Sequence, residues 1–144
     1  MVIGYATGVF DLFHIGHLNI LKKSKSMCDR LIVGVTTDEL MIKYKKKEAV
    51  IPFEERIEIV QSIKYVDSTV PQESMNKLDV WKRIKFNIMF VGDDWYESEK
   101  WINIEKELSS VGAEVVYFPY TKTTSSTLIN QILEEKRSDK EENP

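Results

Sequence analysis

Gly8-Val9-Phe10-Asp11-Leu12-Phe13-His14-Ile15-Gly16-His17 is the stretch that decides the predicted fold. The apolar run before it, residues 2–7, is typical of a buried strand. The apolar spacing after it, through Leu18 and Leu21, is typical of an amphipathic helix. The chain therefore turns tightly at Gly8 between a strand and a helix. His14 and His17, three residues apart, are expected on one side of the first helical turn.

This strand–turn–helix junction suits an anion. Unpaired N–H groups and a positive partial charge gather at a helix N-terminus, and Gly16 leaves room for a bulky group to approach the backbone. A single histidine near a helix start is more often a cap or a packed ring. Two histidines at this spacing, after a glycine turn, favour a phosphate-binding cradle, and we predict one here.

The rest of the chain alternates apolar runs with helical patterns. This alternation predicts a single Rossmann-like, doubly wound α/β domain with a five-stranded parallel sheet. We predict a catalytic domain over residues 1–134 and a charged, frayed tail over residues 135–144. The expected strands are residues 2–7, 31–36, 66–70, 88–91 and 115–118, and the helical patterns cover residues 18–27, 53–63, 78–85, 101–108 and 127–133.

Composition narrows the class of protein. The 144 residues carry a formal net charge of −3, so bulk charge gives no reason to expect a nucleic acid partner. No run of residues is long and apolar enough for a membrane span, so we expect no membrane partner. The single cysteine, Cys28, excludes an internal disulfide, fits a cytoplasmic protein and is expected to act as a small buried hydrophobe.

The residues that follow each strand are the candidates for binding, because ligands of parallel sheets lie beyond the carboxyl ends of the strands. A solvated loop is the ordinary interpretation of Lys43 to Lys47, but beside a phosphate cradle we favour a mobile cationic loop that closes over a triphosphate. Gly92-Asp93-Asp94-Trp95 suits a ribose or a base, the alternative being a turn with a capping aspartate. Thr121 to Thr127 is predicted to form a second anion site, the alternative being plain helix N-capping.

Gly8 to His17 resembles the G-x-F-D-x-x-H-x-G-H signature of the cytidylyltransferases, a branch of the H-x-G-H nucleotidylyltransferases. With Glu55-Arg56, Gly92 to Trp95 and Thr121 to Thr127, the order of motifs is similar to that of the bacterial glycerol-3-phosphate cytidylyltransferase family. The resemblance implies transfer of CMP from CTP to sn-glycerol 3-phosphate, giving CDP-glycerol and pyrophosphate. It also implies a Mg²⁺-dependent cytoplasmic homodimer that supplies polymers of the teichoic-acid type and needs no organic cofactor.

In this reaction an acceptor phosphate oxygen attacks the α-phosphorus of CTP in line and pyrophosphate leaves. The acceptor is already an anion, so the site needs no strong general base. We predict that His14, His17, Lys45 and Lys47 are catalytic, with Lys43 or Lys46 as substitutes for the two loop lysines. The predicted nucleotide-binding residues are Gly8, Val9, Phe10, Asp11, His14, Gly16, His17, Gly92, Asp94, Tyr120, Thr121, Ser125, Ser126 and Thr127. The predicted acceptor-binding residues are Lys45, Lys77, Asp38, Arg56 and Trp95, and Asp11 is also expected near Mg²⁺.

The last motif departs from the family pattern R-T-x-G-I-S-T-T. Tyr120 stands where the arginine is usual and Thr123 replaces the glycine. A tyrosine does not supply the cationic fork of an arginine, although Lys122 offers a point charge nearby. Val9 also occupies a position where threonine is common. The departures bear on acceptor identity and rate more than on nucleotide binding.

Three alternatives remain open at the level of sequence. One is an adenylyltransferase of the same fold that uses ATP, with pantetheine phosphate or FMN as acceptor. Another is a cytidylyltransferase for a different phospho-alcohol or phospho-sugar. The third is a weakly active nucleotide-binding protein. A partner subunit would explain exposed apolar residues such as Phe53 and Trp81, and packing within one chain explains them equally well.

Overall fold

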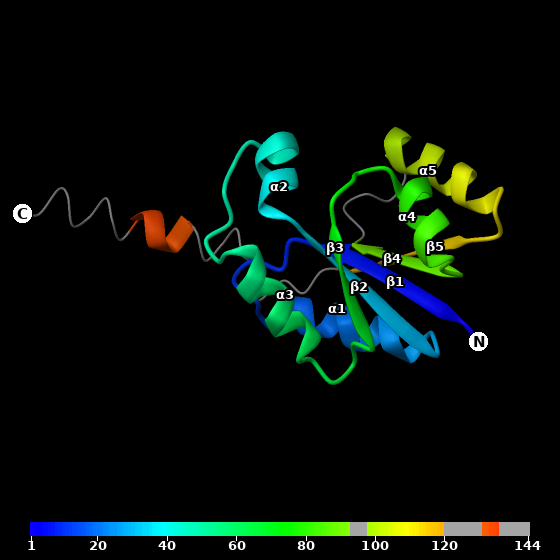
Figure 1. Cartoon of the computed structure of the whole chain (residues 1–144), viewed down its shortest axis with the longest axis horizontal. Helices are drawn as coiled ribbons and strands as arrows, with labels where there is room; N and C mark the ends of the chain where they lie inside the picture. Colours follow the sequence, from blue (N-terminus) through cyan, green and yellow to red (C-terminus); the bar gives the residue numbers. More distant parts are fainter. Residues whose placement is uncertain (93–97, 120–130, 136–144) are drawn as a thin grey trace, which may run out of the picture.

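The computed structural model describes residues 1–92, 98–119 and 131–135 (Figure 1). Strands and helices alternate along the chain, and residues 131–135 are helical. The elements, in order, are β1 (Ile3–Gly8), α1 (Ile15–Ser26), β2 (Arg30–Thr36), α2 (Asp38–Lys45), α3 (Phe53–Gln61), β3 (Ser68–Gln72), α4 (Lys77–Ile84), β4 (Ile88–Gly92), α5 (Glu99–Ser109) and β5 (Glu114–Phe118).

The strands form one five-stranded sheet in the order β3-β2-β1-β4-β5, and every pair of neighbours is parallel. The predicted fold class is therefore confirmed. From β1 the chain builds outward through β2 to β3, then crosses back to place β4 on the other side of β1. Ligands of such sheets bind where the order reverses, so the carboxyl ends of β1 and β4 mark the expected site.

Two apolar clusters hold helices to opposite faces of the sheet. Ala6 of β1 packs with residues of α1 and α3, whereas the neighbouring Tyr5 packs with residues of α4 and α5. Successive side chains of a strand point to opposite faces, which explains this division. Figure 1 shows α1 and α3 on one side of the sheet and α4 and α5 on the other. Phe53 and Trp81 pack against these clusters, so packing within one chain accounts for both.

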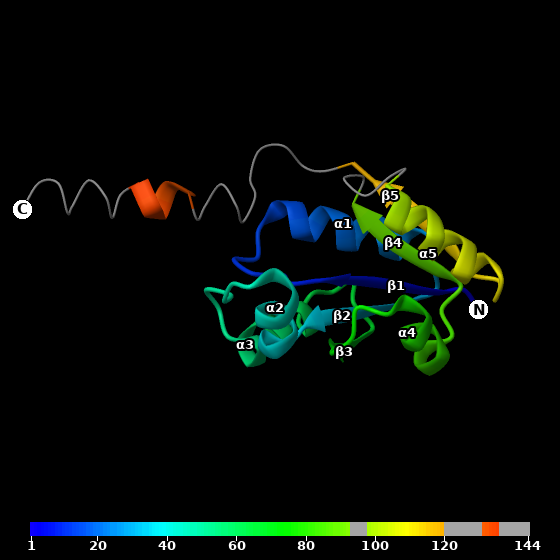
Figure 2. The ribbon, with the colours of Figure 1, turned by 90° about the horizontal axis from the view of Figure 1, so that it is seen from above.

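The carboxyl ends of β1 and β2 open toward the N-terminal end of α1 and toward α2. Figure 2 shows α2 and the N-terminal end of α1 toward the same end of the sheet, while the rest of α1 runs along the sheet. The basic stretch was expected to be a loop, but Lys43 and Lys45 lie in α2, whose N-terminus is capped by the Thr37 side chain at 3.2 Å from the Leu40 N–H. Buried Leu40 and Met41 anchor this helix to the domain.

The third strand lies two residues later than expected. Val66 donates its N–H to the Ile63 carbonyl at 3.0 Å, which places it in the turn after α3, and β3 continues through Pro71 to Gln72. A proline is tolerated there because β3 is an edge strand with β2 as its one neighbour in the sheet. Within the described residues, no helix is long and apolar enough to cross a bilayer.

Candidate active site

The turn after β1 is held in an unusual backbone conformation. Phe10 and Leu12 both have positive φ angles, 55° and 51°, which side-chain-bearing residues rarely adopt. Each such position costs of the order of 1–3 kcal/mol, and such strain concentrates at functional sites. Phe10 is buried against the Phe13 and His17 rings, with centroid separations of 6.3 and 5.5 Å, and this packing keeps the turn in place.

The two histidines cap helix α1 and also line its mouth. His14 is the N-cap residue, and its Nδ1 accepts a hydrogen bond from the Gly16 N–H at 3.0 Å. His17 Nδ1 accepts from the His14 N–H at 3.1 Å, so the pair forms a capping box in which both side-chain acceptors are imidazoles. The ring centroids are 4.1 Å apart. Because each Nδ1 is an acceptor, each neutral ring carries its proton on Nε2 and offers that N–H to a ligand.

Both imidazoles are neutral at pH 7. Burial lowers the pKa of His17 to about 4, with the neighbouring His14 ring adding to the effect and Asp11 opposing it. Burial also lowers the pKa of His14 below its ordinary value. At this pH the pair therefore offers an anion two neutral N–H donors, not two imidazolium charges. A triphosphate bound here would need its positive charge from elsewhere in the protein or from a metal ion.

A dependence of stability on pH follows from the lowered pKa of His17. Between about pH 6.5 and pH 4 the unfolded chain binds a proton at this ring that the folded protein does not, so the folded state loses stability as the pH falls. The ring is partly exposed, so we expect a loss of about 1–2 kcal/mol across this range. Urea unfolding at pH 7 and pH 4.5 measures it. The free energy of unfolding of His17→Gln should fall by about 1–2 kcal/mol less than that of the parent over the same pH range. Equal losses in both proteins would contradict the lowered pKa of His17.

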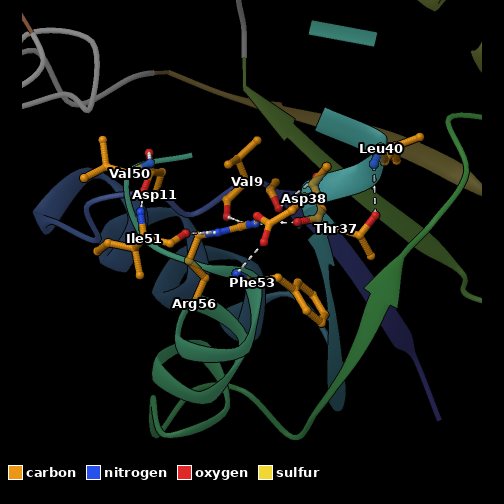
Figure 3. A network of polar contacts seen from close by, with 11 residues as sticks. Val9, Asp11, Thr37, Asp38, Leu40, Val50, Ile51, Phe53 and Arg56 are labelled. Atoms are coloured by element: carbon orange, nitrogen blue, oxygen red, sulfur yellow. Dashed lines mark hydrogen bonds and ion pairs between the residues drawn. The ribbon is translucent and has the colours of Figure 1, made fainter. Parts of the chain in front are cut away.

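The turn between β1 and α1, residues 8–14, is called the histidine turn below. Arg56 lies at the centre of a buried polar network beside it (Figure 3). Arg56 as a whole residue is 1% exposed, and its Nη1 donates to the carbonyls of Val9 at 2.7 Å and Thr36 at 2.8 Å. Its Nε donates to the Ile51 carbonyl at 2.8 Å, and its Nη2 donates to Asp38 Oδ1 at 2.6 Å. The guanidinium thus joins the turn after β1, the end of β2, the start of α2 and the loop before α3.

Asp38 completes this network. Its second oxygen accepts a hydrogen bond from the Phe53 N–H at 3.1 Å. Burial alone would raise the pKa of Asp38, but the hydrogen bonds from Phe53 and Arg56, together with the charge of Arg56, hold it below its ordinary value. Protein groups occupy four N–H donors of the arginine and both oxygens of the aspartate, and the predicted contact of these two residues with the acceptor stays a prediction. In this structure they position the turn.

Asp11 has a similar positioning role. Its side chain is 7% exposed, and its two oxygens accept hydrogen bonds from the backbone N–H groups of Val50 at 2.8 Å and Ile51 at 2.9 Å (Figure 3). This carboxylate fastens the loop before α3 to the histidine turn. The predicted contact of Asp11 with Mg²⁺ stays a prediction. Within residues 1–92, 98–119 and 131–135, no three histidine, cysteine or acidic side chains lie close enough together to hold a metal ion.

The structure brings together the predicted nucleotide-binding residues of the first motif. Gly8, Val9, Phe10, Asp11, His14, Gly16 and His17 all lie at the carboxyl end of β1 or at the mouth of α1, and Gly92 ends the adjacent β4. Lys47 lies exposed in the loop after α2. Lys77 opens α4 but is 8% exposed, with its Nζ 6.0 Å from the centre of the Trp101 ring. Its contact with the acceptor stays a prediction.

The other predicted site residues lie outside the described parts of the chain. They are Asp94, Trp95, Tyr120, Thr121, Ser125, Ser126, Thr127 and the side chain of Lys45. Sequence reasoning also missed Thr36, which is 8% exposed and donates its hydroxyl to the Gly8 carbonyl at 3.1 Å. The signal for it was weak, because Thr36-Thr37-Asp38 indicates a helix N-cap but not which threonine contacts the turn.

Comparison with known proteins gives a consistent set of similarities. Residues 5–138 match the sequence profile of the family described as "Cytidylyltransferase-like". The FAD synthase of Thermococcus kodakarensis is 31% identical over 132 residues, which cover 88% of this chain and 89% of that protein. The glycerol-3-phosphate cytidylyltransferase of Bacillus subtilis is 32% identical over 126 residues, covering 86% and 91%. The crystal structure of a lipopolysaccharide core biosynthesis protein from Thermoplasma volcanium superposes with a TM-score of 0.71 at 26% identity, covering 86% of this chain and 99% of that one.

Proposed function

Because the chain belongs to the cytidylyltransferase-like family and is therefore a nucleotidyltransferase, we propose that it transfers CMP from CTP to a phosphorylated alcohol. The leading acceptor is sn-glycerol 3-phosphate, the substrate named for three relatives at 32–34% identity. The products are then CDP-glycerol and pyrophosphate. The observation that supports this best is the pair of neutral imidazoles at the mouth of α1, each with Nδ1 fixed by a backbone N–H.

The histidine geometry suits stabilisation of the transition state. An acceptor phosphate oxygen attacks the α-phosphorus, and negative charge develops on the oxygens around that atom. Two preorganised Nε2–H donors stabilise such charge without reorganising, because the capping bonds already orient the rings. Lys45 and Lys47 are proposed to supply the positive charge that the neutral imidazoles lack. The strained turn and the Arg56 network keep the donors in place before CTP arrives.

Mg²⁺ stays in the proposal as the counter-ion that CTP carries on its phosphates. The Asp11 oxygens are held by backbone N–H groups, so the described residues offer no carboxylate for the metal at this turn. We also propose a cytoplasmic homodimer on the basis of the resemblance, and with it a supply of CDP-glycerol to teichoic-acid-type polymers. The packing of Phe53 and Trp81 within the chain gives no support to a dimer face there.

A second candidate function is adenylyl transfer from ATP to FMN. The observation that favours it is that archaeal FAD synthases are 31–35% identical to this chain, as similar as the glycerol-3-phosphate cytidylyltransferases. An experiment must therefore distinguish two substrate pairs: glycerol 3-phosphate with CTP, and FMN with ATP. The last motif, with Tyr120 in place of arginine, is the reason for a third candidate function: a nucleotide-binding protein with little turnover.

Pyrophosphate release tests the proposal. The purified full chain is assayed with CTP or ATP against glycerol 3-phosphate and FMN. We expect kcat/KM for CTP with glycerol 3-phosphate to exceed that for ATP with FMN by tenfold or more. The reverse preference would establish the second candidate. Tight CTP binding in calorimetry, with no pyrophosphate released in the presence of either acceptor, would establish the third candidate, a nucleotide-binding protein with little turnover.

A further inference from the structure

An open groove of about 510 Å³ lies between α2 and the loop that follows β3. This volume is within the range of small-molecule sites, roughly 300–1,000 Å³. Helix α2 and the residue before it supply one wall, and Glu73 and Ser74 supply the other. The helical wall consists of Thr37, Glu39, Leu40, Lys43 and Tyr44.

The groove begins next to the histidine turn. Thr36 donates its hydroxyl to the Gly8 carbonyl at 3.1 Å, and Thr37, the next residue, lines the groove. The Thr37 N–H in turn bonds the Gln72 carbonyl at 3.2 Å, so the groove lies over the ends of β2 and β3. The predicted nucleoside contacts follow β4, on the other side of β1. A nucleotide held at β1 and β4 therefore leaves the side of β2 and β3 to the acceptor.

Both walls of the groove are fixed by buried polar contacts. The Thr37 side chain caps α2. Opposite it, the Gln72 side chain accepts from the Tyr5 hydroxyl and donates to the Ser74 carbonyl. Burial raises the pKa of Tyr5 to about 12, so this hydroxyl stays protonated and remains a donor. The groove is thus formed before any ligand binds.

The chemistry of the lining suits hydroxyl groups better than phosphate. Glu39 and Glu73 are exposed carboxylates that repel a phosphate and accept hydrogen bonds from alcohols. Tyr44 is 55% exposed and presents an aromatic surface on which an organic chain or ring can pack. Lys43 lies with its Nζ 5.4 Å from the centre of that ring and is the one cation among the described residues of the lining. The acceptor's phosphate therefore belongs at the histidines and lysines, with its uncharged part in the groove.

We propose that the groove binds the hydroxylated chain of an acceptor longer than glycerol 3-phosphate, a phosphorylated polyol of five or more carbons. This inference rests on the proposed function and names its acceptor class. A glycerol unit fills roughly four times the ~30 Å³ of a liquid water, or about 120 Å³, so it leaves most of the groove empty. Glycerol 3-phosphate is then a substrate, but not the best one. Two kinds of molecule carry such a hydroxylated five-carbon chain with a phosphate: a free pentitol phosphate, and FMN in its ribityl phosphate.

A comparison of acceptors tests the inference on the full chain. Pyrophosphate release is measured with CTP and, separately, with ATP, using glycerol 3-phosphate, ribitol 5-phosphate or FMN. With CTP as the donor, we expect kcat/KM for ribitol 5-phosphate to exceed that for glycerol 3-phosphate by tenfold or more. FMN with ATP as the best pair would instead assign the groove to the ribityl phosphate of FMN and establish the second candidate function. Tyr44→Ala should reduce this preference ratio about tenfold. Ile42→Ala is the matched control, because Ile42 lies on the same helix at 49% exposure but outside the groove, and it should keep the ratio of the parent.

The outcomes separate this inference from the proposed function. Turnover of glycerol 3-phosphate with CTP, without turnover of either longer acceptor, would overturn the inference and leave the proposed function standing. An unchanged preference ratio in Tyr44→Ala would also overturn it. If no pyrophosphate is released with any of the three acceptors, the proposed function fails. The groove is then judged by calorimetry with ribitol 5-phosphate, where binding that Tyr44→Ala weakens upholds it and no binding overturns it.

Discussion

His17→Gln is expected to lower kcat for pyrophosphate release by about 10²- to 10³-fold, the loss typical of removing one preorganised donor to transition-state charge. The substitution replaces the rigid imidazole Nε2–H, which we propose as the donor to the ligand, by a flexible amide N–H₂ that the capping bond does not hold in the same direction. It keeps an acceptor for the His14 N–H, because glutamine is a usual residue at the third position of a capping box. The free energy of unfolding should therefore stay within about 1 kcal/mol of the parent at pH 7.

The structure provides matched controls for this loss. His17→Ala removes the donor and the cap together, so it should lose the same activity and about 1 kcal/mol more stability than His17→Gln. His14→Asn keeps a strong N-cap residue and removes the other imidazole, and it should also lose activity with little change in unfolding. Steady-state kinetics and urea unfolding on the same preparations measure both quantities. A His17→Gln protein with the kcat of the parent would show that the imidazole serves the helix alone.

The sequence was sufficient to predict the sheet and the position of the histidine turn. Strands β1, β2, β4 and β5 are short apolar runs ended by glycine, threonine or proline, and these local signals survive in the folded protein. The histidine spacing also predicted a shared helical turn, because it depends on residues three positions apart. The two interpretations of the histidines, cap and phosphate ligand, are compatible: Nδ1 makes the cap and Nε2 remains for the ligand.

Roles that depend on distant contacts were not predictable in the same way. Asp11 looked like a metal or nucleotide ligand, but its carboxylate pairs with backbone groups about 40 positions later in the chain. Arg56 and Asp38 were predicted to bind the acceptor, and only the fold shows the guanidinium buried among carbonyls. In α2, adjacent buried Leu40 and Met41 give no helical period, so tertiary packing and the Thr37 cap decide the helix.

Arg56→Met is expected to lower the free energy of unfolding by about 3–5 kcal/mol, the largest stability loss predicted for this chain. Methionine fills much of the volume but donates nothing, so the carbonyls of Val9, Thr36 and Ile51 lose their buried partner and Asp38 loses its ion pair. Arg56→Lys keeps the charge but not the planar fork, so it should recover only part of the loss. Urea unfolding of the three proteins at pH 7 measures the series.

Burial is the reason for this cost, and an exposed ion pair of the same chain tests that reason. Lys25 and Asp67 are 2.7 Å apart with side chains 31% and 39% exposed, whereas the Arg56 side chain in its pair with Asp38 is 0% exposed. Lys25→Met should therefore cost about 1 kcal/mol or less. Because Arg56 also holds the Val9 carbonyl of the histidine turn, Arg56→Lys should raise KM for CTP, while Lys25→Met should not. Equal stability losses for Arg56→Met and Lys25→Met would contradict the central position of Arg56 in the site.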